Sequence, residues 1–565
     1  VETFEKRVFR RFLPQGLPTP RDFQKLSEDQ QKIWALIEQS LDSNNYKAFL
    51  LHGVTGSGKT EVYLHAVRKC LELKKTALVL VPEISLTPQL VNRFRERFGD
   101  LVAVLHSGMD DGERFDEWSR IQLEQAKIAI GARSAIFAPL QNLGLVIIDE
   151  EHDQSYKQGE SPRYQGRDVA VYRAFQKKTT VIMGSATPSI ESWQNSRTGK
   201  YHLLELPSRA VTGSKLPEVK LLDLRQQPRQ SGCYFFTKEL VEALRICLQK
   251  QEQAILFLNR RGYAPIVQCP ECENTINCDA CSLSLVYHQS SEKLCCHQCD
   301  HTQGFPKICP HCAIQTAMRL VGTGTEQIEQ DLRVVFPEAR LLRMDRDTLH
   351  GKHALSEMQQ KIQRHEVDIV IGTQLVTKGH DFPNVTLVGV LLADLGLNLP
   401  DFRSAERTFQ LLTQVAGRAG RGEKPGRVLI QTNNPNHHSL LTAQLQNYES
   451  FVNQELPLRE RLRQPPFLSL ASVLCVSRDE NRAKNLALSL RHNLRSNGQA
   501  EVICQGPVEA PIHRINHRFR WQVLIKASSS GLIRKVFEKS LLGPESLICS
   551  REENIILDID PQHLM

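Results

Sequence analysis

The sequence contains no long hydrophobic run. Its apolar stretches all stay well short of the roughly 18 uninterrupted residues that a membrane-spanning helix requires. The first residues, from Val1 to Arg7, are mostly polar or charged, so they also lack the apolar core of a secretory signal peptide. We therefore expect a soluble intracellular protein without a membrane segment. Because the first residue is Val and not Met, we also expect the chain to be a fragment.

The chain has too many apolar residues to be a disordered protein, and it has no strong excess of one charge. Of its 565 residues, 41% are hydrophobic and 24% are charged, and the formal net charge is +8. These values are ordinary for globular proteins, and the length predicts several domains. A small basic surplus is compatible with a polyanionic partner, but it is common without one, so charge alone assigns no function.

Cysteine is sparse outside one segment. Nine of the 15 cysteines lie between Cys269 and Cys312, and eight of them form four C-x-x-C pairs. The eight are Cys269, Cys272, Cys278, Cys281, Cys296, Cys299, Cys309 and Cys312. Such clustering favours a metal site in a reducing compartment over disulfides. Because tetrahedral Zn²⁺ takes four thiolates, eight cysteines predict two structural Zn²⁺ ions, with an iron–sulfur cluster as the chemical competitor.

Short apolar runs alternate with helix-length segments in two series, which predicts two tandem α/β domains with parallel sheets. The first series comprises 48–51, 77–81, 102–105, 128–130, 145–148 and 181–183, and the second comprises 254–258, 341–344, 369–371, 387–392 and 428–430. An amphipathic run over 483–494 and a strand over 520–526 indicate a separate small α+β domain. The predicted parts are a linker or tail of a missing domain (1–25), a first lobe (26–205), a second lobe (206–265 and 319–455), a cysteine-rich insertion (266–318) and a C-terminal domain (456–565).

A phosphate-binding loop is predicted between the first strand and the helix that follows it. The sequence Gly53-Val54-Thr55-Gly56-Ser57-Gly58-Lys59-Thr60 matches G-x-x-x-x-G-K-[ST]. In such a loop the backbone N–H groups surround phosphate oxygens, Lys59 reaches the β/γ-phosphates and Thr60 binds Mg²⁺. A glycine-rich turn without function is the alternative, and the flanking strand and helix disfavour it. We therefore expect ATP with Mg²⁺ as ligand.

Two further motifs complete a nucleotide-hydrolysing site. An apolar strand ends at Asp149 and Glu150, which predicts a carboxylate that holds Mg²⁺ and one that polarises the attacking water. In the second lobe, Gln414-Val415-Ala416-Gly417-Arg418-Ala419-Gly420-Arg421 offers guanidinium groups for the charge that develops on the transferred phosphoryl group. An Arg-rich helix surface is the alternative interpretation. The predicted catalytic set is Lys59, Thr60, Asp149, Glu150, Gln414, Arg418 and Arg421.

A loop after the acidic motif carries aromatic and basic residues together. Tyr156 and Tyr164 are interleaved with the basic residues Lys157, Arg163 and Arg167 on a loop that contains Gly and Pro. This composition suits base stacking combined with phosphate contact, so we predict a contact with single-stranded nucleic acid. An ordinary solvated loop is the alternative.

Together these motifs resemble superfamily-two helicases, and the resemblance extends from about Leu26 to Asp560. It includes 82–89, 131–135, 184–188, 258–262, 372–374 and 377–381. The Asp-Glu-Glu-His form of the acidic motif and the inserted cysteines narrow it to the bacterial primosomal replication-restart helicases. The resemblance implies two RecA-like lobes and an ATP-driven motor that moves 3′ to 5′ on single-stranded DNA, binds forked DNA and restarts stalled forks by primosome assembly.

The resemblance also implies roles for single residues. Gln30 would touch the adenine, Gly379 and Asp381 would face the nucleotide from the second lobe, and Thr87, Arg133, Thr373 and Lys378 would contact the DNA backbone. The outer C-x-x-C pairs would share one zinc and the inner pairs the other. Primosome proteins and the single-stranded-DNA-binding protein would be partners in the bacterial cytoplasm, near the nucleoid. The family's N-terminal DNA-binding and winged-helix domains would be missing from this chain.

Two kinds of alternative to a helicase remain, a different motor of the same superfamily and a non-enzymatic protein. The shared motifs do not choose between a helicase, a double-stranded DNA translocase and an RNA-remodelling ATPase. A non-enzymatic, zinc-stapled nucleic-acid-binding scaffold is the other possibility, although such a scaffold needs neither Glu150 nor Arg421. One chain carries both halves of the ATP site, so a monomer suffices for activity.

Overall fold

A computed structural model describes most of the chain. The described residues are 21–82, 88–210, 216–228, 235–258, 266–269, 276–279, 285–288, 293–296, 301–306, 308–310, 312–314, 319–321, 325–345, 348, 354–373, 376, 382–397, 401–420, 424–542 and 552–564. The chain divides into two compact units, Val1–Leu258 with Ala339–Ala393 and Glu406–Phe451, and Asn259–Glu338 with Asp394–Ala405 and Val452–Met565. Each unit is described by itself.

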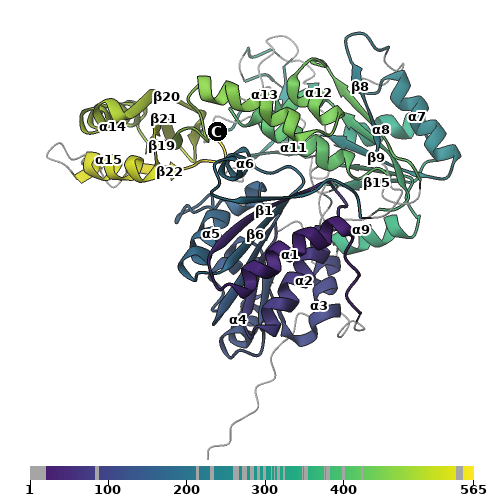
Figure 1. Ribbon diagram of the computed structural model, residues 1–565. Coiled ribbons are helices and arrows are strands. Elements are labelled where there is room, and N and C mark those ends of the chain that lie inside the picture. The colour runs from purple at the N-terminus through teal and green to yellow at the C-terminus, as the bar shows by residue number, and fades with distance from the viewer. Residues whose placement is uncertain are drawn as a thin grey trace, which may run out of the picture. The chain divides into compact units, whose positions relative to one another are not determined.

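The first lobe of the first unit is built on a seven-stranded parallel sheet in the order β3-β4-β2-β5-β6-β1-β7. Its strands are β1 (Lys47–Gly53), β2 (Thr76–Leu80), β3 (Val102–Leu105), β4 (Ile128–Gly131), β5 (Leu143–Asp149), β6 (Thr180–Ser185) and β7 (His202–Leu206). The helices are α1 (Glu28–Asp42), α2 (Lys59–Glu72), α3 (Pro88–Phe98), α4 (Asp111–Gln122), α5 (Gly166–Gln176) and α6 (Ile190–Arg197), with short 3₁₀ turns η2 (Gly99–Leu101), η3 (Arg133–Phe137) and η4 (Gln154–Tyr156). Figure 1 shows α1 and α2 on one side of β1 and β6, and α5 on the other.

The strand order places the predicted nucleotide motifs side by side. β6 pairs with both β1 and β5, so the carboxyl ends of these three strands lie next to one another. β1 leads into the phosphate loop, β5 ends at Asp149 and β6 ends at Ser185. Ligand sites of parallel α/β sheets form at the carboxyl ends of the strands, so this sheet edge is where a nucleotide site is expected.

The second lobe of the first unit contains a six-stranded parallel sheet in the order β15-β16-β9-β17-β18-β8. Its strands are β8 (Glu218–Asp223), β9 (Gln253–Leu258), β15 (Leu341–Met344), β16 (Ile369–Gly372), β17 (Val385–Leu391) and β18 (Arg427–Thr432). Its helices are α7 (Lys238–Gln249), α9 (Ala354–Gln363), α11 (Ser404–Ala416) and α12 (His438–Gln444). The predicted pair of parallel-sheet domains is thereby confirmed, and all the predicted strands are present. β7 and β8 were not predicted, because each lies at a sheet edge and alternates exposed with buried residues.

The second unit contains two antiparallel sheets. The cysteine-rich insertion forms the sheet β13-β12-β11-β10-β14 from three-residue strands, namely β10 (Ile266–Gln268), β11 (Val286–His288), β12 (Lys293–Cys295), β13 (Thr302–Gly304) and β14 (Arg319–Val321). Helix α8 (Thr325–Val335) follows it. The 3₁₀ turn η5 (Ala393–Gly396) and helix α13 (Tyr448–Arg461) lie where the chain passes from one unit to the other.

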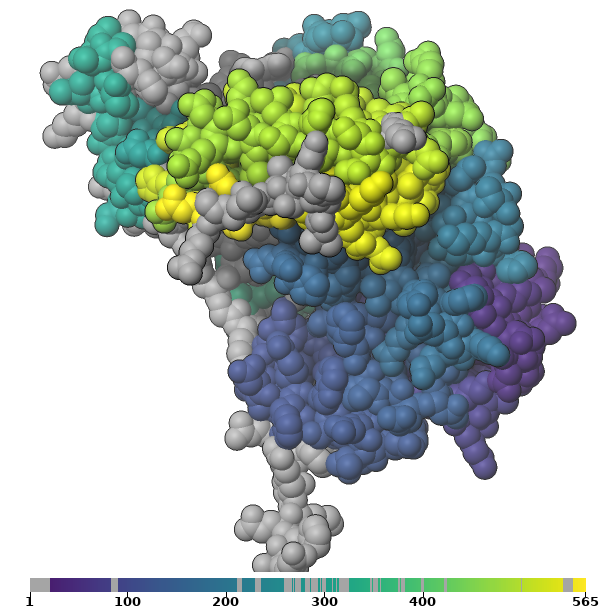
Figure 2. Space-filling model, turned by 90° about the vertical axis from the view of Figure 1, so that its left-hand side faces the viewer, coloured from purple at the N-terminus to yellow at the C-terminus, as the bar shows by residue number. Residues whose placement is uncertain are grey.

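The C-terminal part of the second unit is an α+β domain, as predicted. Its sheet has the order β20-β21-β19-β22, with β19 (Ser469–Ser477), β20 (Val502–Ile515), β21 (Arg518–Ala527) and β22 (Asn554–Ile559). Helices α14 (Glu480–Gly498) and α15 (Ser530–Leu542) pack their apolar faces onto this sheet, and the turn η6 (Gln499–Glu501) follows α14. Figure 2 draws this domain in yellow-green and yellow. Across the described part of the chain, no helix combines the length and the apolar character that a membrane crossing needs.

Candidate functional site

The phosphate loop joins the buried strand β1 to helix α2. Its bend requires glycine at two positions, because Gly56 and Gly58 have φ angles of 83° and 79°. Gly58 is the N-cap residue of α2 and supplies no side-chain acceptor for the first-turn N–H groups. Ser57 Oγ is buried beside them without a hydrogen-bond partner. Because a helix N-terminus favours an anion and leaves N–H groups without intrahelical acceptors, the loop fits a phosphate group.

The side chains of Lys59 and Gln30 donate hydrogen bonds to the backbone of this loop. The Lys59 ammonium donates to the Gly53 carbonyl at 2.7 Å. Gln30 Nε2 donates to the Ser57 carbonyl at 3.0 Å, and a β-carbon on Gly58 would lie only 2.4 Å from that nitrogen. Gln30 also closes the capping box of α1 with Ser27. The structure thus places Gln30 against the loop backbone, while its predicted adenine contact remains a prediction.

Asp149 and Glu150 lie at the end of β5, close to the phosphate loop. The Tyr63 hydroxyl donates to Asp149 Oδ1 at 3.0 Å. Burial and the neighbouring Glu150 carboxylate raise the pKa of Asp149 to about 6, and Lys59 and the Tyr63 hydrogen bond counteract part of that rise. Glu150 has a φ of 45°, and its buried Oε2 has no hydrogen-bond partner. Two crowded carboxylates beside a lysine and an open phosphate loop fit a divalent cation, which would relieve their repulsion.

His152 connects the acidic motif to β6 and to the second lobe. Its Nδ1 lies 2.7 Å from Ser185 Oγ, and its Nε2 lies 2.9 Å from Gln414 Nε2 on α11. Because an amide nitrogen donates, Nε2 of His152 is the acceptor and Nδ1 carries the proton toward Ser185. Ser185 Oγ in turn accepts from the Thr187 N–H at 2.9 Å. The chain of hydrogen bonds therefore runs from the acidic motif to both lobes.

The phosphate loop and the arginine-rich motif meet directly across the two lobes. A β-carbon on Gly417 would lie 2.7 to 2.9 Å from three side-chain atoms of Thr55, so the approach requires glycine. Arg418 follows in the turn after α11, where its N–H donates to the Val415 carbonyl at 3.0 Å. The predicted finger Arg421 lies outside the described residues, as do Gly379 and Asp381. The structure thus brings one arginine of the motif into the turn that packs against the loop.

The predicted nucleic-acid loop is anchored by Arg133. Its Nη1 donates to the carbonyls of Ser155 at 3.0 Å and Lys157 at 2.6 Å. Tyr156 is completely buried and donates to the Asp149 carbonyl at 2.7 Å. The predicted base stacking by Tyr156 does not fit this structure, because its ring packs in the core and is not available to a base. Its hydroxyl instead ties the loop to the acidic motif.

Tyr164 keeps an accessible position in the same loop. Its ring meets the Phe137 ring edge-to-face at 5.3 Å between centroids, and Phe137 is itself 54% exposed. Arg163 is partly exposed beside it. Thr373 follows β16 in the second lobe and is also partly exposed, whereas Thr87 and Lys378 lie outside the described residues.

Some site residues were missed at the sequence level. Tyr63 lies four residues after Lys59 on α2, so helical spacing could have placed it on the same face. Glu151 is buried and accepts from the Ser189 N–H at 2.6 Å and from Arg167 at 3.0 Å, which fixes the start of α6. The contact between Gly417 and Thr55 could not be predicted from a local pattern, because it joins residues far apart in the sequence.

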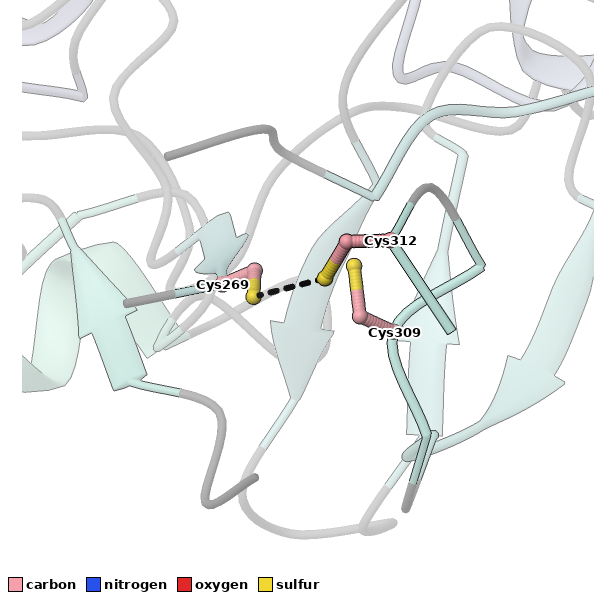
Figure 3. Close-up of side chains that lie close together, drawn as sticks. All are labelled: Cys269, Cys309 and Cys312. Carbon is pink, nitrogen blue, oxygen red and sulfur yellow. Dashed lines mark hydrogen bonds between the residues drawn. The ribbon is translucent and has the colours of Figure 1, made fainter. Parts of the chain in front are cut away.

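Three thiols of the cysteine-rich insertion converge. Figure 3 shows the sulfur atoms of Cys269, Cys309 and Cys312 pointing toward one another. The ligand atoms all lie within 4.8 Å of one another, and the sulfurs of Cys269 and Cys312 are 3.8 Å apart. Cys278 and Cys296 are buried in the apolar cluster of the insertion. Cys272, Cys281 and Cys299 lie outside the described residues.

Comparisons with known proteins agree with these motifs. The DEAD/DEAH box helicase family model matches residues 27–196, and the model of the primosomal protein N C-terminal domain matches residues 460–562. The replication restart protein PriA of Bacillus subtilis is 46% identical over 540 residues, which cover 96% of this chain and 67% of that protein. The protein of the same name from a Synechocystis species is 43% identical over 532 residues, which cover 92% of this chain and 63% of that protein.

These relatives are longer than this chain, which spans about two thirds of their length. Among solved structures, RecG bound to a three-way DNA junction is similar with a TM-score of 0.44 and 17% identity, covering 79% of this chain and 53% of that one. A likeness at this level concerns the fold alone. The matched helicase domain implies a nucleotide with a metal ion as ligand.

Proposed function

This chain belongs to the family of the replication restart protein PriA and is an ATP-dependent helicase, and from that premise we propose that it moves 3′ to 5′ along single-stranded DNA at branched DNA. We further propose that it restarts stalled replication forks by primosome assembly. One observation supports the motor most directly. The phosphate loop of the first lobe packs against the turn after α11 of the second lobe, at Thr55 and Gly417. ATP bound there would contact both lobes.

In the proposed site, each residue has one task. Lys59 would hold the β/γ-phosphates, and Thr60 and Asp149 would hold Mg²⁺, which supplies charge neutralisation to the phosphates when bound. Glu150 would orient and polarise the attacking water from its place beside Asp149. Arg418 and Arg421 would stabilise the charge that develops on the transferred phosphoryl group. The unpartnered Ser57 Oγ in the loop and the crowded carboxylates of Asp149 and Glu150 support this arrangement.

The hydrogen bonds of His152 support a coupling between hydrolysis and movement. Gln414 reaches His152 from the second lobe, and His152 reaches Ser185 in the first. A change at Glu150, which lies 3.7 Å from His152, would therefore be felt by both lobes. If each lobe changes its affinity for DNA between the open and closed states, the strand moves in one direction.

The loop that Arg133 holds at Ser155 and Lys157 is proposed to bind single-stranded DNA. The Tyr164 ring would stack on a base, and Lys157 and Arg163 would contact phosphates. Tyr156 links this loop to Asp149, so DNA at the loop would influence the acidic motif. Thr87, Thr373 and Lys378 are proposed as further backbone contacts by family resemblance, and Gln30, Gly379 and Asp381 as nucleotide contacts on the same ground.

Two structural Zn²⁺ ions are proposed for the cysteine-rich insertion. The convergence of Cys269, Cys309 and Cys312 supports an outer site that Cys272 would complete. Cys278, Cys281, Cys296 and Cys299 would form the inner site. Thiolates are the ligands that structural zinc prefers, and three such side chains within 4.8 Å fit a tetrahedral ion.

The proposed partners are forked DNA, primosome proteins and the single-stranded-DNA-binding protein, all on the ground of family membership. We also propose a monomer in the bacterial cytoplasm near the nucleoid. The packing of Thr55 against Gly417 within one chain supports a monomeric ATP site, since both halves are present.

Strand separation on tailed duplexes tests this proposal. The chain should unwind a duplex with a 3′ single-stranded tail much faster than one with a 5′ tail, and Lys59→Ala should unwind neither. Equal or reversed preference would overturn the polarity. ATP hydrolysis that responds equally to RNA or to blunt duplex, without strand separation, would favour an RNA-remodelling ATPase or a double-stranded DNA translocase instead.

A further inference from the structure

We infer that Arg209 is a positioning residue that holds the arginine-bearing turn of the second lobe against the phosphate loop. This inference rests on the proposed function, in which Arg418 and Arg421 stabilise the transferred phosphoryl group. Arg209 itself lies in neither motif. It belongs to the segment 206–210 by which the chain leaves β7.

The backbone of this segment is bonded to the phosphate loop at two points. The Val54 N–H donates to the Leu206 carbonyl at 3.1 Å, and the Ala210 N–H donates to the Gly56 carbonyl at 2.9 Å. A β-carbon on Gly58 would also lie 3.1 Å from Ala210 Cβ. The segment therefore keeps a fixed distance from the loop.

The side chain of Arg209 extends from this anchored segment to the second lobe. Its Cγ atom lies 3.9 Å from the position that a β-carbon on Gly56 would take, so its stem covers the loop. Its Nη1 donates to the Gly420 carbonyl at 3.0 Å. Gly420 lies between Arg418 and Arg421 in the sequence, so Arg209 is bonded to the backbone between the two arginines that are proposed to stabilise the transition state.

The turn at Gly420 is equally well fixed on its own lobe. The Gly420 N–H donates to the Val385 carbonyl at 3.0 Å, at the start of β17. Gly420 has a φ of 64°, and a β-carbon there would lie 2.5 Å from the Gly426 nitrogen. The bond from Arg209 therefore joins two rigid supports, one on each lobe.

This geometry predicts an effect on turnover and little effect on ATP binding. Ground-state contacts come from the phosphate loop, which stays intact when Arg209 is removed. The approach of Arg418 and Arg421 matters in the transition state, where a misplacement of about 1 Å can lower the rate by roughly a hundredfold. A residue that merely covers the loop would change ATP affinity and protein stability instead.

Steady-state ATP hydrolysis with single-stranded DNA tests the inference. Arg209→Ala should lower kcat by roughly tenfold to a hundredfold, with KM for ATP changed by no more than about twofold. Arg209→Lys should recover part of the rate, because it keeps the charge without the planar fork of donors. Arg197→Ala is the matched control, since Arg197 is exposed at the end of α6, and it should behave as the wild type.

A mutant cycle with the double variant Arg418→Ala/Arg421→Ala distinguishes positioning from packing. If Arg209 acts through the arginine-bearing turn, Arg209→Ala should cost no more than about twofold once both arginines of that turn have been removed. Additive losses, an unchanged kcat, or a kcat loss accompanied by a lower melting temperature would overturn the inference. A wild type without DNA-stimulated hydrolysis would instead overturn the proposed function, and the inference with it.

Discussion

The first lobe and the cysteine-rich insertion fold by different means. The first lobe has a cluster of 25 described buried residues that draws on parallel strands and on α1, α2 and α3. The insertion has three-residue strands and a described cluster of only six buried residues, two of which are cysteines. The first lobe can therefore be stabilised by apolar burial, whereas the insertion needs another source of stability.

The same residue type shows this difference. Cys70 lies in the core of the first lobe, where burial raises the pKa of its thiol to about 12 and its Sγ donates to the Thr76 carbonyl. It packs as a small apolar residue. Cys269 instead lies near two other sulfur atoms, an arrangement that a cation bound to the thiolates would stabilise. Both cysteines are buried, so burial does not distinguish a cysteine that packs in the core from one that could bind a metal. The presence of other thiols nearby does.

The largest expected effect follows from removing one thiol of the converging group. Cys309→Ser should lose one of the two proposed zinc ions and unfold the insertion, because structural zinc supplies about 10 to 16 kcal/mol of apparent binding free energy in small zinc peptides. Metal content and segment-resolved hydrogen exchange measure both consequences. The first lobe should keep its protection. Cys70→Ser, the matched control, should keep the full zinc content, and equal zinc loss in both variants would contradict the distinction.

A second expected effect tests how tightly the first lobe is packed. A β-carbon on Gly184 would lie 1.6 Å from the Tyr63 hydroxyl oxygen, so Gly184→Ala must displace the ring that bonds Asp149. The free energy of unfolding should fall by about 3 kcal/mol, at the upper end of what overpacking of a core typically costs, because the overlap is severe.

Denaturant unfolding measures this change, and Tyr63→Phe in the same chain should restore part of the loss. Gly159→Ala is the control, because no described atom lies within 4 Å of the β-carbon position there. Gly184→Ala with wild-type stability would show that the ring moves freely and that the site is looser than the structure indicates.

The third expected effect is a dependence on pH that originates in the first lobe. Burial and the nearby Lys59 ammonium lower the pKa of His52 to about 4 from the ordinary value of 6.5. Between these values the unfolded chain binds a proton that the folded chain does not, so stability falls as the pH falls from 6.5 toward 4. The contribution of His52 to this loss, measured as the difference between wild type and a variant without this histidine, should be roughly 2 kcal/mol at pH 5.

Unfolding free energies at pH 7 and pH 5 measure this loss. His52→Gln should remove it, whereas His492→Gln, at an exposed position of α14, should retain it. The same pH dependence in wild type and His52→Gln would place its origin elsewhere.

The smallest expected effect concerns apolar support for the insertion. Ile515, at the end of β20, packs against the six-residue cluster of the insertion. Ile515→Ala should lower the stability of the insertion by about 1 kcal/mol, because a partly buried side chain is shortened. Hydrogen exchange of β10 and β12 measures it. Val508→Ala on the same strand is the control, since Val508 is 53% exposed. A loss as large as that from Cys309→Ser would mean that apolar contact, and not metal, holds the insertion.

Much of the fold was predictable because central strands of a parallel sheet are buried on both faces. β2 and β4 are buried at every residue and read as plain apolar runs. Edge strands carry a weaker signal: β7 alternates exposed and buried positions and was missed. The phosphate loop and the carboxylates were predictable because their chemistry demands fixed residues at fixed spacing.

Other parts of the site depend on distant contacts that leave no local pattern. Tyr156 lies in a loop of polar composition, yet its ring is buried. Its hydroxyl can be buried with the ring because it donates a hydrogen bond to the Asp149 carbonyl. The glycine of the arginine-rich motif faces Thr55, and Arg209 faces Gly420, only because the two lobes bring these residues together. Such pairs follow from the arrangement of the sheets, which the sequence does not state directly.

The most direct test of the two-lobe motor is steady-state ATP hydrolysis with and without forked DNA that carries a single-stranded arm. Wild type should show strong stimulation by this DNA. Glu150→Gln should lose turnover by about 10² to 10⁴-fold while it still binds ATP, because the group that polarises the water is gone. Arg421→Ala should likewise lose turnover, and Glu242→Gln, at an exposed position of α7, should behave as the wild type. Hydrolysis that is indifferent to DNA, or that survives Glu150→Gln, would contradict the account.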